Sequence, residues 1–241
     1  MGPKRSDDAN AFDAPHRWIA APVCGYDRRM SPASPRLDDL PESMTWDELA
    51  SLPAELATQI ELHEGRVVIV RSGPPRHQRF YRRMANALEA CARSDMRRAS
   101  DSCWQVDVET NVFFADKSDF RTPDFLVYHC LNSGDQDIWS RDVVLVGEVL
   151  SPANTHAGIE SKKAKYASAG IPWYWEADLD GDAISTIRAY ALELSAELPD
   201  GVTPLRSRNY ILVDEWSQDA APGVEAHLPF PIKIPWAELA F

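Results

Sequence analysis

Residues 142–152 read Asp-Val-Val-Leu-Val-Gly-Glu-Val-Leu-Ser-Pro, an apolar run that carries one carboxylate near its end, Glu148. A run of this kind, closed by a Ser-Pro break, is typical of a strand buried on both faces of a sheet. A carboxylate in such a strand is costly unless a cation, a hydrogen-bond network or a raised pKa holds it there. Glu148 is therefore a candidate functional residue. The stretch is equally compatible with a strand-end Glu in a solvent-exposed salt bridge.

The length and charge of the chain limit the protein classes that it fits. Its 241 residues suit one large domain with a tail, and its composition is that of an ordinary soluble globular protein. The formal net charge of −12 argues against a surface that is basic throughout, so any polyanion would need a local basic patch. No apolar stretch approaches the ~20 residues of a membrane span, and no signal peptide opens the chain. We expect a soluble, cytoplasmic protein.

The four cysteines are scattered along the chain, at Cys24, Cys91, Cys103 and Cys130. They form no Cys-x-x-Cys motif and have no paired histidines. This pattern favours reduced thiols and argues against a disulfide framework or a zinc site.

The sequence predicts a mostly disordered extension over residues 1–43, which are rich in Pro, Asp, Arg and Ala, and a folded domain over residues 44–241. Thr45 and Glu48 form a capping-box pattern at the start of a short helix. Further on, the pattern predicts a hairpin over 60–70 that turns at Glu64-Gly65, helices over about 76–93 and 157–169, a polar loop over 131–140, and strands over 103–114, 121–128, 142–150, 173–178, 183–192 and 210–213. This alternation of strands and helices indicates an α+β (α/β) domain.

The predicted helix from residue 76 is rich in arginine, which reverses the sign of the chain's overall charge in this region. A solvated helix face explains this composition, and contact with phosphates is the sharper alternative. The arginines of this region are Arg76, Arg79, Arg82, Arg83, Arg93, Arg97 and Arg98.

Asp124, which follows Pro123, and Glu148 stand at the ends of predicted antiparallel strands, where their side chains can converge. Mg²⁺ typically takes one or two carboxylates and completes its shell with waters and substrate phosphates. Such an ion activates water and stabilises an in-line displacement at phosphorus, and a nearby ammonium offsets the developing charge. These are the parts of metal-assisted phosphodiester hydrolysis.

From Met44 to Phe241 the chain resembles the Uma2 family, the DUF820 group of restriction-endonuclease-like proteins in the PD-(D/E)XK nuclease superfamily. The matching stretches are Thr45-Trp-Asp-Glu-Leu, Ile60-Glu-Leu-His-Glu-Gly-Arg-Val, Pro75-Arg-His-Gln, Pro123-Asp-Phe-Leu-Val, Glu148-Val-Leu-Ser-Pro, Lys162 with Tyr166, Ala169-Gly-Ile-Pro and Tyr174-Trp. The resemblance implies a PD-(D/E)XK core, that is, a mixed central β-sheet flanked by helices. It also implies a Mg²⁺-dependent nuclease site in which Asp124 and Glu148 are the two motif carboxylates.

The chain departs from the plain Glu-x-Lys pattern, because Leu150 stands two residues after Glu148. Lys162 matches the lysine that the family carries on the following helix, and its spacing from Tyr166 puts both side chains on one helix face. Lys163 and Lys165 are fallback candidates that we expect to be solvated. A second departure is Gly158, which occupies a position where the family usually has Asp.

Two further residues match positions of the family pattern. Glu61 matches an early acidic position and is a candidate third metal-site carboxylate, whereas Glu64 lies nearer the turn and is expected to be exposed. His77, at the start of the arginine-rich helix, also matches the family pattern. It either packs at that helix start or contacts phosphate or water.

The sequence therefore predicts a Mg²⁺- or Mn²⁺-dependent endonuclease that acts on DNA. In this prediction Asp124, Glu148 and Glu61 bind the metal, and Lys162 positions or activates water. Arg76, His77, Arg79 and Arg83 bind the nucleic acid in the same prediction. Relatives of this fold often pair to cut both strands, so a homodimer is compatible with this prediction. The alternative is a catalytically inactive member of the fold that binds nucleic acid or protein.

Overall fold

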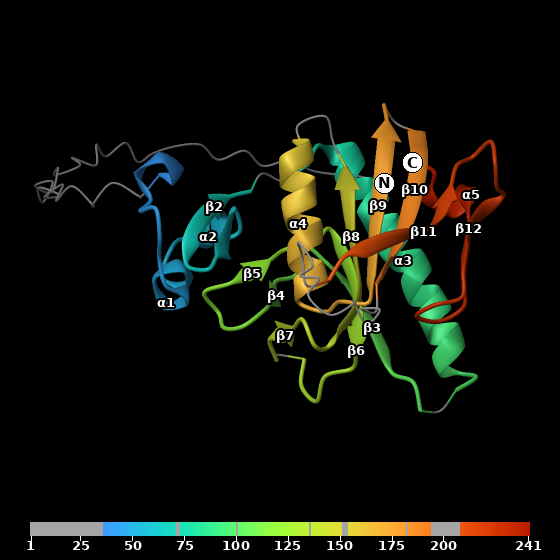
Figure 1. Ribbon diagram of the computed structural model, residues 1–241, viewed down its shortest axis with the longest axis horizontal. Helices are drawn as coiled ribbons and strands as arrows, with labels where there is room; N and C mark the ends of the chain where they lie inside the picture. The colour runs from blue at the N-terminus through green and yellow to red at the C-terminus, as the bar shows by residue number, and fades with distance from the viewer. Residues whose placement is uncertain are drawn as a thin grey trace, which may run out of the picture. The chain divides into compact units, whose positions relative to one another are not determined.

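A mixed sheet of six strands, in the order β11-β10-β9-β8-β6-β3, is the centre of the protein (Figure 1). The computed structural model describes residues 36–70, 73–99, 101–134, 136–150, 154–181, 183–193 and 208–241. Most of the predicted N-terminal extension, residues 1–35, therefore lies outside the described residues. The six strands are β3 (Trp104–Val108), β6 (Phe125–His129), β8 (Val143–Leu150), β9 (Trp173–Asp180), β10 (Ala183–Leu192) and β11 (Tyr210–Trp216).

Strand β8 is the predicted core strand, and seven of its eight residues are buried. It pairs antiparallel with β6 and parallel with β9, and the other neighbouring strands of this sheet are antiparallel. Parallel neighbours need a crossover connection, which is usually helical. Helix α4 (His156–Ser168) supplies it and confirms the helix predicted over 157–169.

The two faces of the sheet are covered by different elements (Figure 1). Helix α3 (Pro75–Met96) packs on one face and buries Phe80, Met84 and Leu88 completely, which confirms the predicted arginine-rich helix. The hairpin of β12 (Gly223–Ala226) and β13 (Ile232–Pro235) and the short α5 (Trp236–Leu239) share its apolar cluster. Helix α4 packs on the other face through Tyr166. Among the described helices, none is long and apolar enough to cross a membrane.

A smaller layer precedes and interrupts the central sheet, around the buried side chains of Met44, Leu49 and Phe120. Thr45 and Glu48 form the predicted capping box at its first α-helix, and the predicted hairpin turns at Glu64-Gly65 with positive φ at both residues. Its elements are η1 (Leu37–Asp39), α1 (Trp46–Ala50), α2 (Ala54–Ala57), the hairpin β1 (Ile60–His63) and β2 (Arg66–Ile69), and a sheet of β5 (Phe120–Arg121), β4 (Val112–Phe113) and β7 (Ile138–Trp139).

Two strand predictions were wrong in detail. The strand expected over 121–128 is divided at Pro123, and its halves β5 and β6 belong to different sheets. Proline has no N–H for a strand ladder, and the amide of Thr122 donates instead to Glu61 Oε1 at 2.9 Å. The loop expected over 131–140 contains β7, which pairs in parallel with β4. The division at Pro123 brings the start of β6 to the boundary between the two layers.

Gly147 allows β6 and β8 to pair closely next to the candidate carboxylates. A Cβ atom at this position would lie 1.9 Å from Cζ of Phe125, the residue that pairs with Gly147 across the two strands. The phenyl ring therefore occupies the space that any other side chain would need. This contact places the residues on either side, Asp124 and Glu148, at one end of the strand pair.

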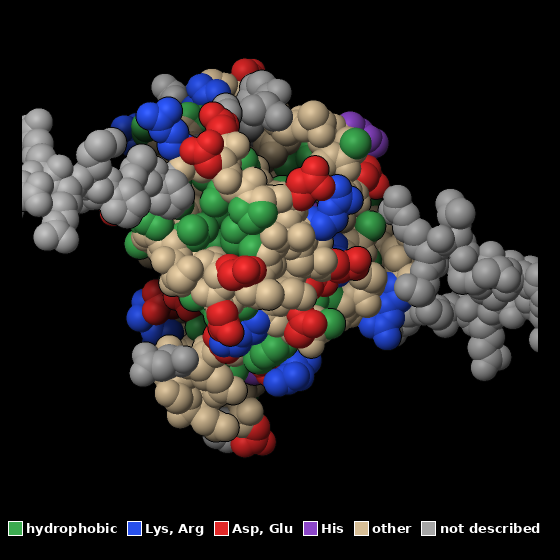
Figure 2. Space-filling model, turned by 90° about the vertical axis from the view of Figure 1, so that its left-hand side faces the viewer, with side chains coloured by type: hydrophobic (Ala, Val, Ile, Leu, Met, Phe, Trp, Pro, Cys, Tyr) green, Lys and Arg blue, Asp and Glu red, His purple; other side chains and the backbone are tan. Residues whose placement is uncertain are grey.

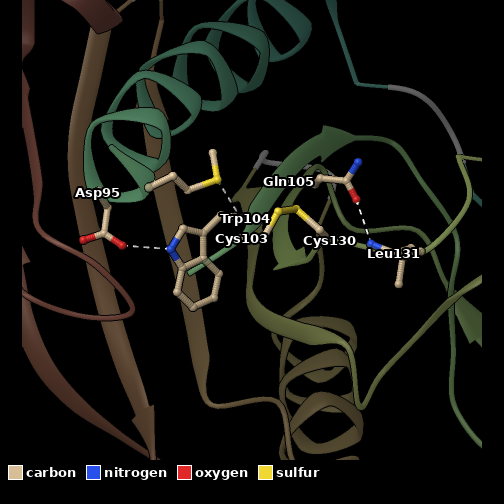
Figure 3. Close-up of a disulfide and its surroundings, with 7 residues drawn as sticks. Asp95, Cys103, Trp104, Gln105, Cys130 and Leu131 are labelled. Carbon is tan, nitrogen blue, oxygen red and sulfur yellow. Dashed lines mark hydrogen bonds between the residues drawn. A yellow bond between two sulfur atoms is a disulfide. The ribbon is translucent and has the colours of Figure 1, made fainter. Parts of the chain in front are cut away.

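Cys103 and Cys130 form a disulfide, so the prediction of reduced thiols was wrong for this pair (Figure 3). Their Cα atoms lie 5.3 Å apart, within the normal range for a disulfide. The antiparallel pairing of β3 with β6 makes Trp104 and His129 partners and thereby brings the two flanking cysteines together. Spacing along the chain could not reveal this pairing. Cys91 is a free thiol, and Cys24 lies outside the described residues.

Replacement of both Cys103 and Cys130 by serine should lower the free energy of unfolding by about 3–4 kcal/mol. The bridge joins residues 27 positions apart and so restricts the unfolded chain. Without it the unfolded chain gains conformational entropy, which lowers the free energy of unfolding by this amount. Urea denaturation in the absence of reductant measures the difference. Cys91→Ser, which alters the free thiol, is the control. An unchanged midpoint in the double variant would show that the bridge does not constrain the unfolded chain.

Candidate functional site

A cleft of about 1100 Å³ lies between the smaller layer and the central sheet. Residues from β1, α3, β6, β8 and α4 meet along its wall. The titratable side chains that line it and were predicted from the sequence are Glu61, His77, Asp124, Glu148 and Lys162. The fold thus brings together residues that are up to 101 positions apart in the sequence.

Glu148 is a buried carboxylate held by two side chains of α4. It is 6% exposed, which excludes the alternative of a solvent-exposed strand-end salt bridge. Lys162 Nζ donates to Oε2 at 2.8 Å, and the Tyr166 hydroxyl donates to Oε1 at 2.9 Å. The two donors are four residues apart and lie on one face of the helix. Cation and hydroxyl together offset the cost of burying the charge.

The charge state of the two donors follows from their surroundings. Burial lowers the pKa of the Lys162 ammonium, but the neighbouring Glu148 and Glu61 carboxylates outweigh burial and raise this pKa overall. Burial and the charge of Glu148 both raise the pKa of the Tyr166 hydroxyl. Lys162 therefore remains a cation, and Tyr166 remains a neutral hydrogen-bond donor.

Asp124 lies directly before β6 and is fixed by the backbone of β8. The amide of Val149 donates to Asp124 Oδ2 at 2.6 Å, and His77 Nε2 lies 3.4 Å from the same oxygen. Burial, followed by the charge of Glu148, raises the pKa of Asp124 well above its ordinary value. The charge of Glu148 therefore disfavours the ionised form of Asp124, which is the electrostatic condition that a bound cation would relieve.

His77 is buried at the first turn of α3, where it bonds the same residue of β8 as Asp124 does. Its Nε2 donates to the carbonyl oxygen of Val149 at 2.7 Å, and burial lowers its pKa. The imidazole is therefore neutral near pH 7 and carries its proton on Nε2. Together, His77 and Asp124 hold both polar groups of Val149, the residue after Glu148. This geometry favours the packing alternative for His77.

Glu61 reaches the cleft from β1 and is 1% exposed. Its Oε1 accepts from the Thr122 amide at 2.9 Å, and its Oε2 lies 2.9 Å from His63 Nε2. Burial would raise its pKa, but His63 and the nearby Lys162 lower it overall, so Glu61 is ionised. Both oxygens already have a partner, which makes Glu61 a less available ligand than Asp124.

Lys163 and Lys165 are not solvated, contrary to the prediction. Lys163 Nζ lies 2.9 Å from Oε1 of Glu176, and Lys165 pairs with Asp119. The acceptors are 4% exposed each. These buried acids were missed in the sequence, although Glu176 stands in the apolar strand sequence Trp173-Tyr-Trp-Glu and could have been found by the same reasoning as Glu148.

The remaining predicted positions lie near the cleft or on the surface. Arg79 and Arg83 are exposed on α3, and Arg76 is partly buried. Gly158 lies in the first turn of α4, where its amide donates to the capping Thr155 hydroxyl at 3.1 Å. On the face that carries α1, α2 and β2, Asp and Glu side chains are interspersed with Lys and Arg around a hydrophobic patch (Figure 2). This face is therefore of mixed charge rather than basic.

The donor set fits a hard divalent cation that takes only part of its shell from the protein. Asp124 and Glu148 supply carboxylate oxygens to one cleft, and each oxygen can accept more than one bond. Among the residues that the structure describes, no group of three or more His, Cys, Asp or Glu side chains could hold a metal. A cation held by Asp124 and Glu148 would need waters or phosphate oxygens of a substrate to complete its shell.

The chain matches the model of one known protein family. The model of the Uma2 family, described as "Putative restriction endonuclease", matches residues 46–205. The chain belongs to the Uma2 family. The matched range contains all the site residues above, and it confirms the resemblance seen in the sequence.

Comparison with solved structures agrees on the fold. A crystal structure described as that of a putative nuclease belonging to DUF820, from Anabaena variabilis ATCC 29413, matches with a TM-score of 0.51 at 16% sequence identity. The match covers 81% of this chain and 97% of that chain. A comparison with curated proteins found no match. The predicted mixed sheet flanked by helices is thus confirmed as the nuclease-like fold of this family.

The raised pKa of Asp124 makes the stability of the metal-free protein depend on pH. As the pH rises from 3.8, the ordinary value for this group, the unfolded chain releases the Asp124 proton before the folded chain does, so wild-type stability falls. Asp124→Asn cannot ionise and keeps an acceptor for Val149. In urea titrations with EDTA, the variant should match wild type near pH 3.5 and exceed it at pH 7.5. An advantage that shrinks as pH rises would contradict the assignment.

Proposed function

We propose that this Uma2 protein is a Mg²⁺- or Mn²⁺-dependent endonuclease that hydrolyses phosphodiester bonds of DNA. The observation that carries the proposal is the meeting of Asp124, Glu148 and the Lys162 ammonium in one cleft of a nuclease-like fold. The cytoplasmic location expected from the sequence belongs to the same proposal. Pairing of two copies would let two such sites cut both strands.

The roles of the residues follow from their charge and contacts. Asp124 and Glu148 would hold the metal, and the chemistry that it would supply is that of a Lewis acid. Lys162 remains protonated, so it acts as a hydrogen-bond donor and fixed positive charge rather than as a general base. It orients the attacking water and offsets negative charge on the phosphorus centre. Tyr166 and His77 hold the Glu148–Val149 segment in place.

Glu61 has a supporting role in this site. It is ionised, and its negative charge helps to keep Lys162 protonated. Its oxygens are already bonded to Thr122 and His63. Metal contact by Glu61, as expected from the sequence, would have to share oxygens that already have partners.

The central experiment measures cleavage of supercoiled plasmid and of single-stranded DNA with Mg²⁺, Mn²⁺ or EDTA. Asp124→Asn and Glu148→Gln should each reduce the metal-dependent rate by about a hundredfold or more, because each removes a charge that holds the metal. Glu225→Gln is the matched control, since Glu225 lies exposed on β12. Full cleavage by a folded Asp124→Asn variant would refute the assignment of the site.

The alternative function is a catalytically inactive module that binds nucleic acid or protein. It is favoured by one observation: both oxygens of Glu148 already accept hydrogen bonds from Lys162 and Tyr166. The melting temperature distinguishes the two functions. A protein that binds Mg²⁺ or Mn²⁺ in its folded state melts at a higher temperature as the metal concentration rises, and a module without a metal site does not.

The exposed arginines of α3 provide the electrostatic part of the proposed DNA contact. Arg79→Ala combined with Arg83→Ala should weaken binding of a labelled duplex. It should also reduce the slope of log Kd against log salt concentration by about 1 for each phosphate that the variant no longer neutralises. Fluorescence anisotropy in an Asp124→Asn background, where cleavage is blocked, measures the slope. Lys233→Ala, at a lysine that is 78% exposed on β13, is the control. An unchanged slope would place the DNA elsewhere.

A further inference from the structure

A second buried carboxylate lies next to the proposed catalytic one. Glu176 on β9 is the register partner of Glu148 on the parallel strand β8, so both side chains lie on the sheet face that α4 covers. Glu176 is 4% exposed and does not line the cleft. The proposed mechanism gives it no role. A buried charge of this kind is retained at a cost and calls for a physical reason.

The partners of Glu176 enclose a second lysine of α4. Lys163 Nζ lies 2.9 Å from Glu176 Oε1 and 3.4 Å from Glu160 Oε1. The Tyr190 hydroxyl donates to the other oxygen of Glu176 at 2.9 Å, and the Lys163 ammonium lies 4.2 Å from the centre of the Tyr190 ring. The Lys163 side chain is 16% exposed. The Glu176 carboxylate and the Tyr190 ring therefore hold the Lys163 ammonium, and with it this turn of α4, in one position over the sheet.

Apolar packing holds α4 less firmly than α3. Over its 13 residues α4 buries two side chains, Tyr166 and Ala167, whereas α3 buries eight over 22 residues, seven of them apolar. A helix with a narrow apolar contact can rotate or slide on a sheet at low cost, because few interlocking side chains resist the movement. Polar contacts must then fix its position.

The ion pairs of α4 are arranged to supply this constraint. Lys162 and Lys163 are consecutive and point about 100° apart around the helix axis. Their acceptors, Glu148 and Glu176, lie on adjacent strands, which are about 4.8 Å apart. Two ion pairs on neighbouring strands determine both the rotation and the height of the helix over the sheet. Without the Lys163–Glu176 pair, the hydrogen bond of Tyr166 to Glu148 and the ion pair of Lys165 with Asp119 would still hold α4, but neither of these acceptors lies on β9.

We propose that Lys163 and Glu176 are a positioning pair that fixes α4 so that Lys162 reaches Glu148 in the cleft. The inference deepens the proposed function, on which it rests, and gives a role to two residues that do not touch the cleft. The purpose of the buried pair is geometric specificity rather than stability, since a buried salt bridge adds little net stability on its own.

The test compares Lys163→Met and Glu176→Gln with Lys163→Arg, which keeps the charge, and with Lys233→Met, which removes an exposed lysine on β13. Two readouts are used. Lysine ammonium ¹H–¹⁵N correlation spectra, recorded at one fixed pH without metal, report the Lys162–Glu148 contact directly, and Lys162→Arg identifies the signal. Steady-state cleavage of DNA reports kcat and KM separately.

Lys163→Met and Glu176→Gln should each abolish or shift the Lys162 signal and lower kcat by about a hundredfold with KM unchanged, because misplacement by about 1 Å has effects of this size. Lys163→Arg should restore most of both readouts, and Lys233→Met should alter neither. If Lys163→Met does not fold, Glu176→Gln carries the test, since it keeps the shape of the side chain.

Two results separate this inference from its alternatives. A lower melting temperature with an unchanged Lys162 signal in both variants would show that the pair is merely structural and would overturn the inference. The wild-type protein could cleave neither DNA substrate while both variants lose the Lys162 signal. That result would support the positioning role and refute the proposed nuclease.

Discussion

The cost of burying the charge of Glu148 is the constraint on which the site depends. The carboxylate stands on a strand that is otherwise apolar, and neither of its oxygens is left without a partner. Lys162 supplies a cation and Tyr166 a neutral donor, both from the helix that connects β8 to β9. The crossover helix of the fold is therefore also the source of the groups that make the buried charge tolerable.

The same requirement extends through the α4 side of the protein. Lys163 and Lys165 meet Glu176 and Asp119, so three lysines within four positions each contact a different buried acid. These acids belong to β8, to β9 and to the segment before β5. Because buried ion pairs lose much of their Coulomb energy to desolvation, we expect their main effect here to be the choice of one arrangement of α4 among several of similar energy. Helix α4 thereby ties the smaller layer to the central sheet.

The backbone of the residue that follows Glu148 is fixed by hydrogen bonds at both of its polar groups. Both polar groups of Val149 are bonded, its amide to Asp124 and its carbonyl to His77. Gly147 lets the ring of Phe125 lie against β8. This close pairing brings Asp124, the residue before Phe125, within hydrogen-bond distance of the Val149 amide. A site that must keep two carboxylates close together, against their repulsion, benefits from such rigid support.

Much of the fold follows from local sequence signals. The apolar run that contains Glu148, the capping box at Thr45 and the Glu64-Gly65 turn are short-range patterns, and each predicted its element correctly. Family-specific spacing singled out the acids and the lysine that meet in the cleft. The disulfide, the division of the strand at Pro123 and the ion pair of Lys163 with Glu176 could not be found in this way. They depend on which strands and helices become neighbours, and only the tertiary structure decides that, because long-range pairing leaves no periodic signal in the chain.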